Sequence, residues 1–145
     1  MPQSLLVPVA DETQAEVVCE YLTATYDDVD VTLLHVIEYT EKKTNPSRGG
    51  RDRPEGWYDR ERTEAEDLFE SVRGRLQALG DVETAIEAGD PSAEIVEYAH
   101  SHGADQVVIG LRKRSPTGKL VFGSTAQDIL LSSRVPVVCV PLTES

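Results

Sequence analysis

Four basic side chains, Arg112, Lys113, Arg114 and Lys119, lie in a stretch, 106–127, that contains no acidic residue. Acids dominate the rest of the chain, which has 26 Asp and Glu residues against 14 Lys and Arg residues and a formal net charge of -12. The average density of acids would place about four of them in that stretch. Because clustered cations attract anions, this stretch is the first candidate for a ligand site.

Small polar residues in the same stretch suggest a second way to hold an anion. Gly110 follows an apolar run, and Gly123, Ser124 and Thr125 stand where a helical pattern begins. A helix N-terminus has unpaired N–H groups and a partial positive charge, glycine lets a ligand approach the backbone, and hydroxyls add donors. The same residues are also typical of ordinary helix capping, so anion binding and capping stay open as alternatives.

The spacing excludes two common phosphate motifs. A P-loop needs Ser or Thr directly after its Gly-Lys pair, whereas Leu120 follows Gly118 and Lys119. A dinucleotide fingerprint needs glycines after the first strand, but residues 10–12 are Ala-Asp-Glu. The expected site is therefore split between the end of one strand and the start of the helix that follows it.

The length and the cysteines limit the class of protein to which this chain can belong. A chain of 145 residues suits one domain, 1–145. Cys19 and Cys139 fall in separate apolar segments, and we interpret both as small buried hydrophobes rather than a disulfide or a metal site. No basic leader precedes the first apolar run, and no segment reaches the roughly 18 apolar residues of a membrane span. We therefore expect a soluble, cytoplasmic protein with no membrane partner.

The acidic balance is interpreted as salt adaptation, because abundant counterions screen the repulsion between surface carboxylates. An ordinary acidic protein that charge keeps in solution is the alternative. Nucleic acid is not an expected partner, since a phosphate backbone requires a basic face and only one short loop is basic here.

Apolar runs and helical periodicities alternate along the chain. Strands are expected at 4–9, 30–37, 82–88, 106–109 and 135–140, and helices at 13–26, 57–79, 91–102 and 123–133. Strands that alternate with helices require right-handed crossovers. The pattern predicts a single-domain α/β protein with three layers, in which four helices cover an open, parallel, five-stranded sheet on both faces.

Single residues refine this prediction. Pro8 is expected at the carboxyl end of its strand, because proline cannot donate to the sheet, and Gly80 is expected as the C-cap of the second helix. His35 lies within an apolar strand and is interpreted as a hydrogen-bonded core residue rather than a catalytic one. The connection 38–56 has no periodicity and is expected to be a solvated loop rather than a functional lid.

The whole chain resembles the universal stress protein family. The resemblance rests on five segments that occur in the family's order: LLVPV, TLLHV, AGDPSAEIVEYA, GADQVVIG, and GS followed by SSRVPVVCV. It implies a Rossmann-like fold of the adenine nucleotide α-hydrolase type with strand order 3-2-1-4-5. It also implies a homodimeric, stress-responsive cytoplasmic protein, which in one branch of the family binds ATP or a related adenine nucleotide.

The nucleotide-binding branch has a signature, G-x-x-G, nine residues, then G-[ST], which falls on Gly110, Lys113, Gly123 and Ser124. Three of the four positions match, and Lys113 stands where glycine is expected. Lysine there costs about 1 kcal/mol if the backbone is left-handed, or it offers an ammonium group to a phosphate. Ala10 replaces the family's Asp after the first strand, which removes a carboxylate suited to ribose hydroxyls.

The resemblance implies a specific ligand arrangement. Val36 and Ile37 would flank the adenine, and Asp11 would approach the ribose. The groups around the phosphates would be Gly110, Arg112, Lys113, Gly123, Ser124 and Thr125. The cofactor would be ATP or another adenine nucleotide, with or without Mg²⁺, and no residue is assigned a catalytic or metal-binding role.

We expect a nucleotide-binding protein with a stress-response or regulatory role and without catalytic turnover. The alternatives are a nucleotide-free dimeric interaction module, in which Lys113 and Ala10 mark a lost site, and a slow ATP hydrolase. The last strand is short and apolar, and an uncovered apolar edge promotes association. A homodimer is therefore expected to form through the stretch Val135 to Leu142.

Overall fold

The computed structural model describes residues 3–39, 55–111, 113–114, 120–121 and 123–141. Within them, five parallel strands form one sheet in the order β3-β2-β1-β4-β7. The strands are β1 (Gln3–Pro8), β2 (Val29–Glu38), β3 (Val82–Gly89), β4 (Gln106–Leu111) and β7 (Val137–Pro141). The predicted α/β fold and its strand order are thus confirmed, with β7 as the fifth strand of the main sheet.

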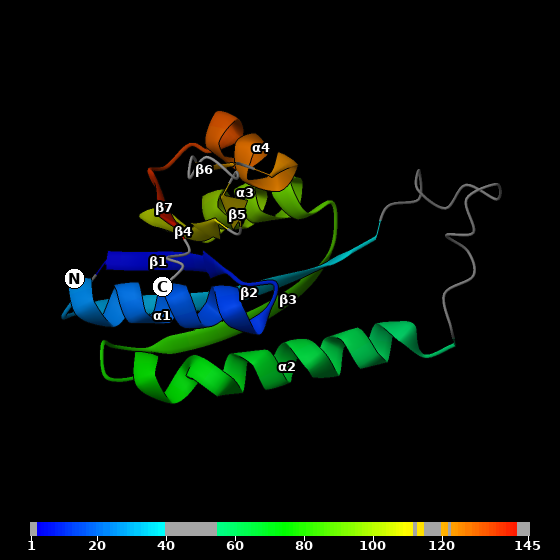
Figure 1. Cartoon of the computed structure of the whole chain (residues 1–145), viewed down its shortest axis with the longest axis horizontal. Helices are drawn as coiled ribbons and strands as arrows, with labels where there is room; N and C mark the ends of the chain where they lie inside the picture. Colours follow the sequence, from blue (N-terminus) through cyan, green and yellow to red (C-terminus); the bar gives the residue numbers. More distant parts are fainter. Residues whose placement is uncertain (1–2, 40–54, 112, 115–119, 122, 142–145) are drawn as a thin grey trace.

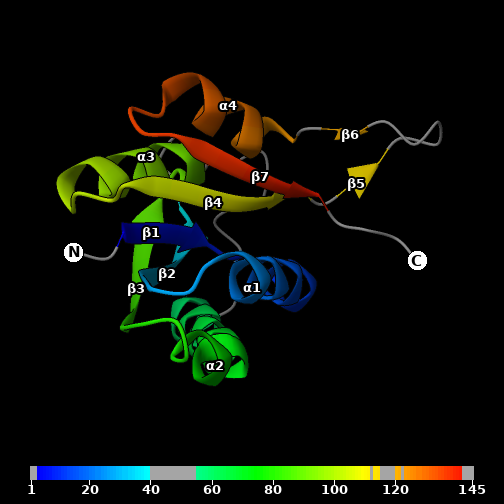
Figure 2. The same cartoon turned by 90° about the vertical axis from the view of Figure 1, so that its left-hand side faces the viewer.

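Four helices cover the two faces of this sheet (Figures 1 and 2). On one face lie α1 (Glu12–Thr25) and α2 (Trp57–Leu76), and on the other α3 (Pro91–Ser101) and α4 (Ser124–Ser132). None of the helices in the described part of the chain is long and apolar enough to cross a membrane. Helices on both faces leave the central strands no solvated side, which explains their nearly continuous apolar sequences.

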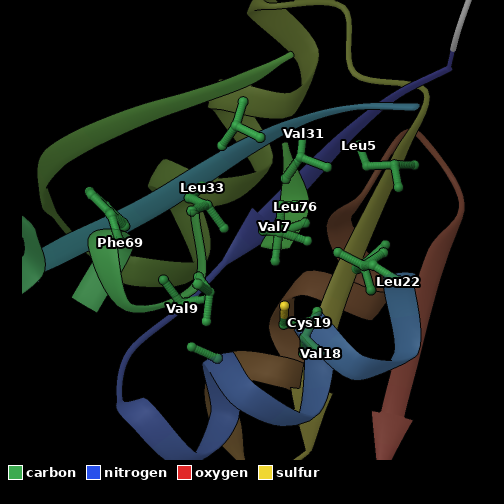
Figure 3. Close-up of a cluster of buried hydrophobic side chains, with 14 of the residues drawn as sticks. Leu5, Val7, Val9, Val18, Cys19, Leu22, Val31, Leu33, Phe69 and Leu76 are labelled. Atoms are coloured by element: carbon green, nitrogen blue, oxygen red, sulfur yellow. The ribbon is translucent and has the colours of Figure 1, made fainter. Parts of the chain in front are cut away.

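Alternate residues of each strand supply two separate hydrophobic cores. Figure 3 shows the first core, where Leu5, Val7 and Leu33 meet side chains of α1 and α2 such as Leu22 and Phe69. The second core lies under α3 and α4 and is formed by Leu6, Leu34, Ile95, Ala99, Val107, Ile109, Leu111 and Ile129. Each strand is thereby held between two helical layers.

The cysteines and the helix caps are close to expectation. Cys19 is buried in the first core, whereas Cys139 is half-buried on β7, and neither forms a disulfide. Asp90 caps α3 by accepting from the N–H of Ala93 at 3.2 Å, as the sequence predicted. Pro8 is the last residue of β1, also as predicted.

Gly80 has a different role from the predicted helix cap. The C-cap of α2 is Gln77, and a Cβ built on Gly80 would lie 2.2 Å from the carbonyl oxygen of Val29. The glycine is therefore needed where the chain turns tightly against the start of β2. The turn that follows a helix cannot be separated from a C-cap by sequence spacing alone.

The acid-free stretch contains two further strands that the sequence did not predict. β4 continues to Leu111, and a small antiparallel pair follows, formed by β5 (Lys113–Arg114) and β6 (Leu120–Val121). Two-residue strands are too short to show a periodicity. The predictions for Arg112, Lys119, Leu142 and most of the connection 38–56 concern residues outside the described part of the chain.

Candidate functional site

A cleft of about 540 Å³ opens at the carboxyl edge of the sheet, between β1 and β4. The chain leaves β1 toward α1 on one face and leaves β4 toward α4 on the other, so this is the topological switch point where doubly wound proteins bind ligands. Its lining comprises Pro8, Val9, Ala10, Gln14, Leu34, His35, Val36, Glu38, Pro91, Ile95, Ile109, Gly110, Leu111, Gly123, Ser124, Thr125, Ala126 and Ile129.

The cleft exists because β1 and β4 pair only briefly. Their ladder has two residue pairs and ends at Leu6 and Val107, whereas β1 pairs with β2 as far as Pro8. The N–H of Val9 donates to β2, so the backbone of Pro8 faces the opposite side, toward β4. Proline has no N–H to give there, and the ladder stops. Pro8 thus adds no ladder bond in the gap that opens between the two central strands at the switch point.

One end of the cleft is the N-terminus of α4. Gly123 is the N-cap residue, with φ -73° and ψ 167°, and no side chain among the described residues caps the helix. The first helical hydrogen bond runs from the N–H of Gln127 to the carbonyl of Gly123, so the N–H groups of Ser124, Thr125 and Ala126 precede it without helical acceptors. By contrast, α1 and α3 both carry aspartate caps. This end of the cleft suits an anion.

Gly110 and Gly123 have different structural reasons to be glycine. Gly110 is buried within β4, and a Cβ there would lie 2.9 Å from Cγ of Gln14 and 3.2 Å from a methyl group of Val18. Gly123 is exposed, and a Cβ there would meet nothing within 4 Å. Packing against α1 explains Gly110, whereas the packing of the described chain places no demand on Gly123. Only Gly123 leaves space open in the cleft.

Five of the predicted site residues line the cleft together: Val36, Gly110, Gly123, Ser124 and Thr125. Two do not. The carboxylate of Asp11 accepts from the N–H of Gln14 at 2.8 Å and caps α1, and Ile37 is 0% exposed. The backbone of Lys113 lies in β5, shortly after the cleft residue Leu111.

His35 is hydrogen-bonded, as the sequence predicted, and it also lines the cleft. Its Nδ1 lies 2.8 Å from the carbonyl oxygen of Val9. A carbonyl can only accept, so Nδ1 carries a proton and Nε2 is the acceptor in the neutral ring. The bond holds the residue that follows β1 against β2.

Sequence reasoning missed two groups of cleft residues. The first is an apolar wall of Leu34, Ile95, Ile109 and Ile129, contributed by β2, α3, β4 and α4. Apolar residues at strand ends have the same pattern whether they face a core or a cleft, so no signal distinguishes them. The second is Gln14, whose side chain bridges two backbone segments far apart in the sequence.

The fold and the cleft define a doubly wound α/β protein with an open cleft at its switch point. The sequence model of the universal stress protein family matches residues 1–141. The chain therefore belongs to the universal stress protein family.

Individual relatives match over different lengths. A universal stress protein of Methanocaldococcus jannaschii is 25% identical over 154 residues, covering 97% of this chain and 95% of that protein. The stress response protein NhaX of Bacillus subtilis is 39% identical over 64 residues, covering 44% of this chain and 37% of that protein. The second match thus spans well under half of the longer relative.

Solved structures match over nearly the whole chain. The M. jannaschii protein superposes with a TM-score of 0.76 at 25% identity, covering 100% of this chain and 99% of that one. A universal stress protein from Archaeoglobus fulgidus superposes with a TM-score of 0.71 at 28% identity, covering 97% and 99%.

Two further structures with the same fold contain nucleotides. An A. fulgidus protein in complex with dAMP is 22% identical, with a TM-score of 0.65 and coverage of 95% and 97%. An Arabidopsis thaliana family protein with AMP bound is 16% identical, with a TM-score of 0.69 and coverage of 98% and 93%.

Proposed function

We propose that this protein binds an adenine nucleotide, with ATP as the leading candidate, in the cleft between β1 and β4, and that binding serves a stress-response or regulatory role without catalytic turnover. The observation that carries the proposal is the uncapped N-terminus of α4 at one end of a cleft whose wall is apolar. Such a cleft matches a ligand that is anionic at one end and flat and apolar at the other. The volume of about 540 Å³ is in the usual range for small-ligand sites.

The phosphates belong at α4. Its first N–H groups and the hydroxyls of Ser124 and Thr125 supply donors, and the helix dipole favours negative charge. Gly123 leaves the approach to these donors open. Arg112 and Lys113 follow the cleft residue Leu111 in the sequence, and their role at the phosphates stays a prediction from the family resemblance.

The base belongs against the apolar wall. Val36 is half-buried near the end of β2 and supplies aliphatic surface beside that wall. Burying the faces of a purine there removes apolar surface from water. Asp11 and Ile37 are left out of the proposed contact set, because neither residue lines the cleft. The ribose is therefore held without Asp11.

Nucleotide content tests the proposal directly. Protein purified in high salt is denatured, and the released small molecules are identified by chromatography; an adenine nucleotide in the extract supports the proposal. Stripped protein is then titrated calorimetrically with ATP, with and without Mg²⁺. An empty extract together with no heat of binding would refute nucleotide binding and favour the nucleotide-free interaction module.

We also propose that the protein forms a homodimer through β7. This strand is at the end of the sheet order, its residues Val137, Val138 and Cys139 are half-buried, and Leu131 on the neighbouring helix is 78% exposed. A second copy paired along this edge would cover apolar surface and unpaired backbone groups. Light scattering on a size-exclusion column at micromolar protein in high salt tests this, and a monomer would refute it.

A further inference from the structure

Gln14 spans the gap that Pro8 leaves between β1 and β4. Its Oε1 accepts from the N–H of Ala10 at 2.7 Å, and its Nε2 donates to the carbonyl oxygen of Gly110 at 3.0 Å. Gly110 and Gln14 are 96 positions apart in the sequence. We call this bridge the Gln14 strap. It joins the turn after β1 to the end of β4 beyond the point where the ladder between them stops.

The amide can take only one orientation in the strap. Exchanging its oxygen and nitrogen would set an acceptor against the Gly110 carbonyl and a donor against the Ala10 N–H. The main chain of Gln14 is fixed as well, because its N–H donates to the Asp11 carboxylate at 2.8 Å. The side chain is therefore held at its base by the helix cap and at its tip by two backbone groups.

The strap requires a glycine at position 110. A Cβ there would lie 2.9 Å from Cγ of Gln14, closer than side chains approach one another, and 3.2 Å from a methyl group of Val18. Gly110 is thus explained by the side chain that crosses above it. Gln14 and Gly110 form a pair in which each limits what the other can be.

Both backbone segments that the strap joins line the cleft. Ala10 lines the cleft on the β1 side and Gly110 lines it on the β4 side. Gln14, which is hydrogen-bonded to both residues, also lines the cleft. On the other side of Ala10, Val9 is bonded to β2 through Leu34 and His35. A continuous set of bonds thus runs from β2 across β1 and α1 to β4, along the rim of the cleft.

We infer that Gln14 is a positioning residue for the nucleotide, which sets the separation of the β1 and β4 walls of the cleft. This inference rests on the proposed nucleotide function. The physical reason is preorganisation: walls held at the right spacing before binding need not be ordered when the ligand arrives. Without the strap, β1 and β4 have no ladder pairing beyond Leu6 and Val107 in the described part of the chain, so their ladder does not fix the width of the cleft.

The test compares two identical substitutions. Gln14→Met keeps the length and volume of the side chain but removes both bonds of the strap. Gln106→Met is the matched control, because Gln106 is also half-buried, makes a side-chain hydrogen bond with the Tyr26 hydroxyl at 3.1 Å, and lies at the opposite end of β4. ATP affinity by calorimetry, melting temperature and hydrogen exchange of the Ala10 amide are measured for both variants.

We expect Gln14→Met to weaken ATP binding by about fivefold or more and to speed exchange of the Ala10 amide by a similar factor. We expect Gln106→Met to lower the melting temperature while leaving both quantities as in the wild type. Equal ATP affinity in Gln14→Met and the wild type would overturn the positioning role. Equal weakening by the two variants would also overturn it, since general destabilisation would then be the cause.

A ligand-free measurement separates this inference from the proposed function. Gly110→Ala is compared in the wild type and in Gln14→Ala, where the nearest obstacle to the new Cβ is gone. The fall in melting temperature should be smaller in Gln14→Ala, and equal falls would show that the strap does not constrain position 110. If the wild type binds no ATP, the proposed function fails, whereas this comparison and the Ala10 exchange still decide whether the strap exists.

Discussion

Replacing Gly123 with aspartate should stabilise the fold and abolish nucleotide binding at the same time. The residue is the N-cap of α4, its φ of -73° suits any amino acid, and its Cβ position is open. An aspartate there can accept a hydrogen bond from the first turn of α4, as Asp11 and Asp90 do in α1 and α3. The same carboxylate would occupy the place proposed for a phosphate.

The gain in stability has two parts. An aspartate N-cap is better than glycine by a few tenths of a kcal/mol, and its charge at the positive end of the helix adds about 0.3–1 kcal/mol. Together they give about 0.5–1 kcal/mol, which raises the melting temperature by roughly 2–4 °C for a chain of this size. Gly123→Asn provides the cap without the charge, so it should give only the capping contribution of a few tenths of a kcal/mol.

The loss in binding follows from Coulomb's law. A carboxylate about 5 Å from a phosphate, at an effective dielectric constant near 20, costs about 3 kcal/mol per unit of phosphate charge. That energy corresponds to more than about a hundredfold in affinity. Gly123→Asn fills nearly the same space without the charge, so it reports the steric part of the effect alone.

The assay is a pair of measurements on three proteins. Melting temperatures and ATP affinities of the wild type, Gly123→Asp and Gly123→Asn are measured at the lowest salt at which all are folded, and affinities again at 1 M KCl. The difference in ATP affinity between Gly123→Asp and Gly123→Asn should shrink in 1 M KCl, where the Debye length is only about 3 Å. If Gly123→Asp binds ATP as tightly as the wild type, the phosphates do not lie at α4. If its melting temperature is unchanged, the N-terminus of α4 does not gain a cap from the aspartate, which would contradict the structural argument.

The remaining predictions concern stability. Gly80→Ala should cost about 1–3 kcal/mol, because its Cβ would lie 2.2 Å from the Val29 carbonyl oxygen. Gly74→Ala should instead gain about 0.5–1 kcal/mol, because Gly74 lies in the last turn of α2 and a Cβ there would meet nothing within 4 Å. Chemical denaturation of both variants checks this, and equal effects would contradict it. Leu22→Ala should cost about 2–5 kcal/mol, since Leu22 is 0% exposed in the first core; a smaller loss in urea unfolding would mean that α1 packs loosely. Burial raises the pKa of the Cys19 thiol above its ordinary value of 9.0. Because the folded state holds the thiol proton more tightly than the unfolded state, this proton stabilises the fold. The stabilisation is complete below pH 9 and is lost as the pH rises through the pKa of the folded state. Melting temperatures from pH 8 to 10.5 should therefore fall less steeply in Cys19→Ala than in the wild type, and parallel curves would refute the assignment.

Much of the fold could be predicted from local chemistry. The alternation of apolar runs and helical periodicities predicted nine regular elements in the right order, and the structure has them with ends shifted by a few residues. Asp90 was predicted as a cap and Pro8 as a strand end because each residue type has a strong local preference. The start of α4 was predicted for the same reason, since Gly123 and Ser124 mark a helix start by composition alone.

The rest of the site could not be predicted, because it depends on contacts between distant segments. Gln14 has no local signal, and its importance comes from reaching Gly110 on another strand. Asp11 was predicted at the ribose by the family resemblance, and only the structure shows that its carboxylate accepts from the N–H of Gln14 and lies outside the cleft lining. A glycine can leave room for a ligand or for a packed side chain, and only the tertiary structure distinguishes the two cases. A Cβ on Gly110 would meet Gln14 and Val18, whereas a Cβ on Gly123 would meet nothing within 4 Å.

By itself, therefore, the sequence determined the order of the elements, the parallel sheet and the place where α4 begins, because periodicity, proline chemistry and capping preferences act over a few neighbouring residues. Only the tertiary structure decided where β1 and β4 separate, that Gln14 crosses the gap, and that the space beside Gly123 stays open. These features depend on distances between residues from opposite ends of the chain, and such distances are set by the packing of whole elements rather than by local preference.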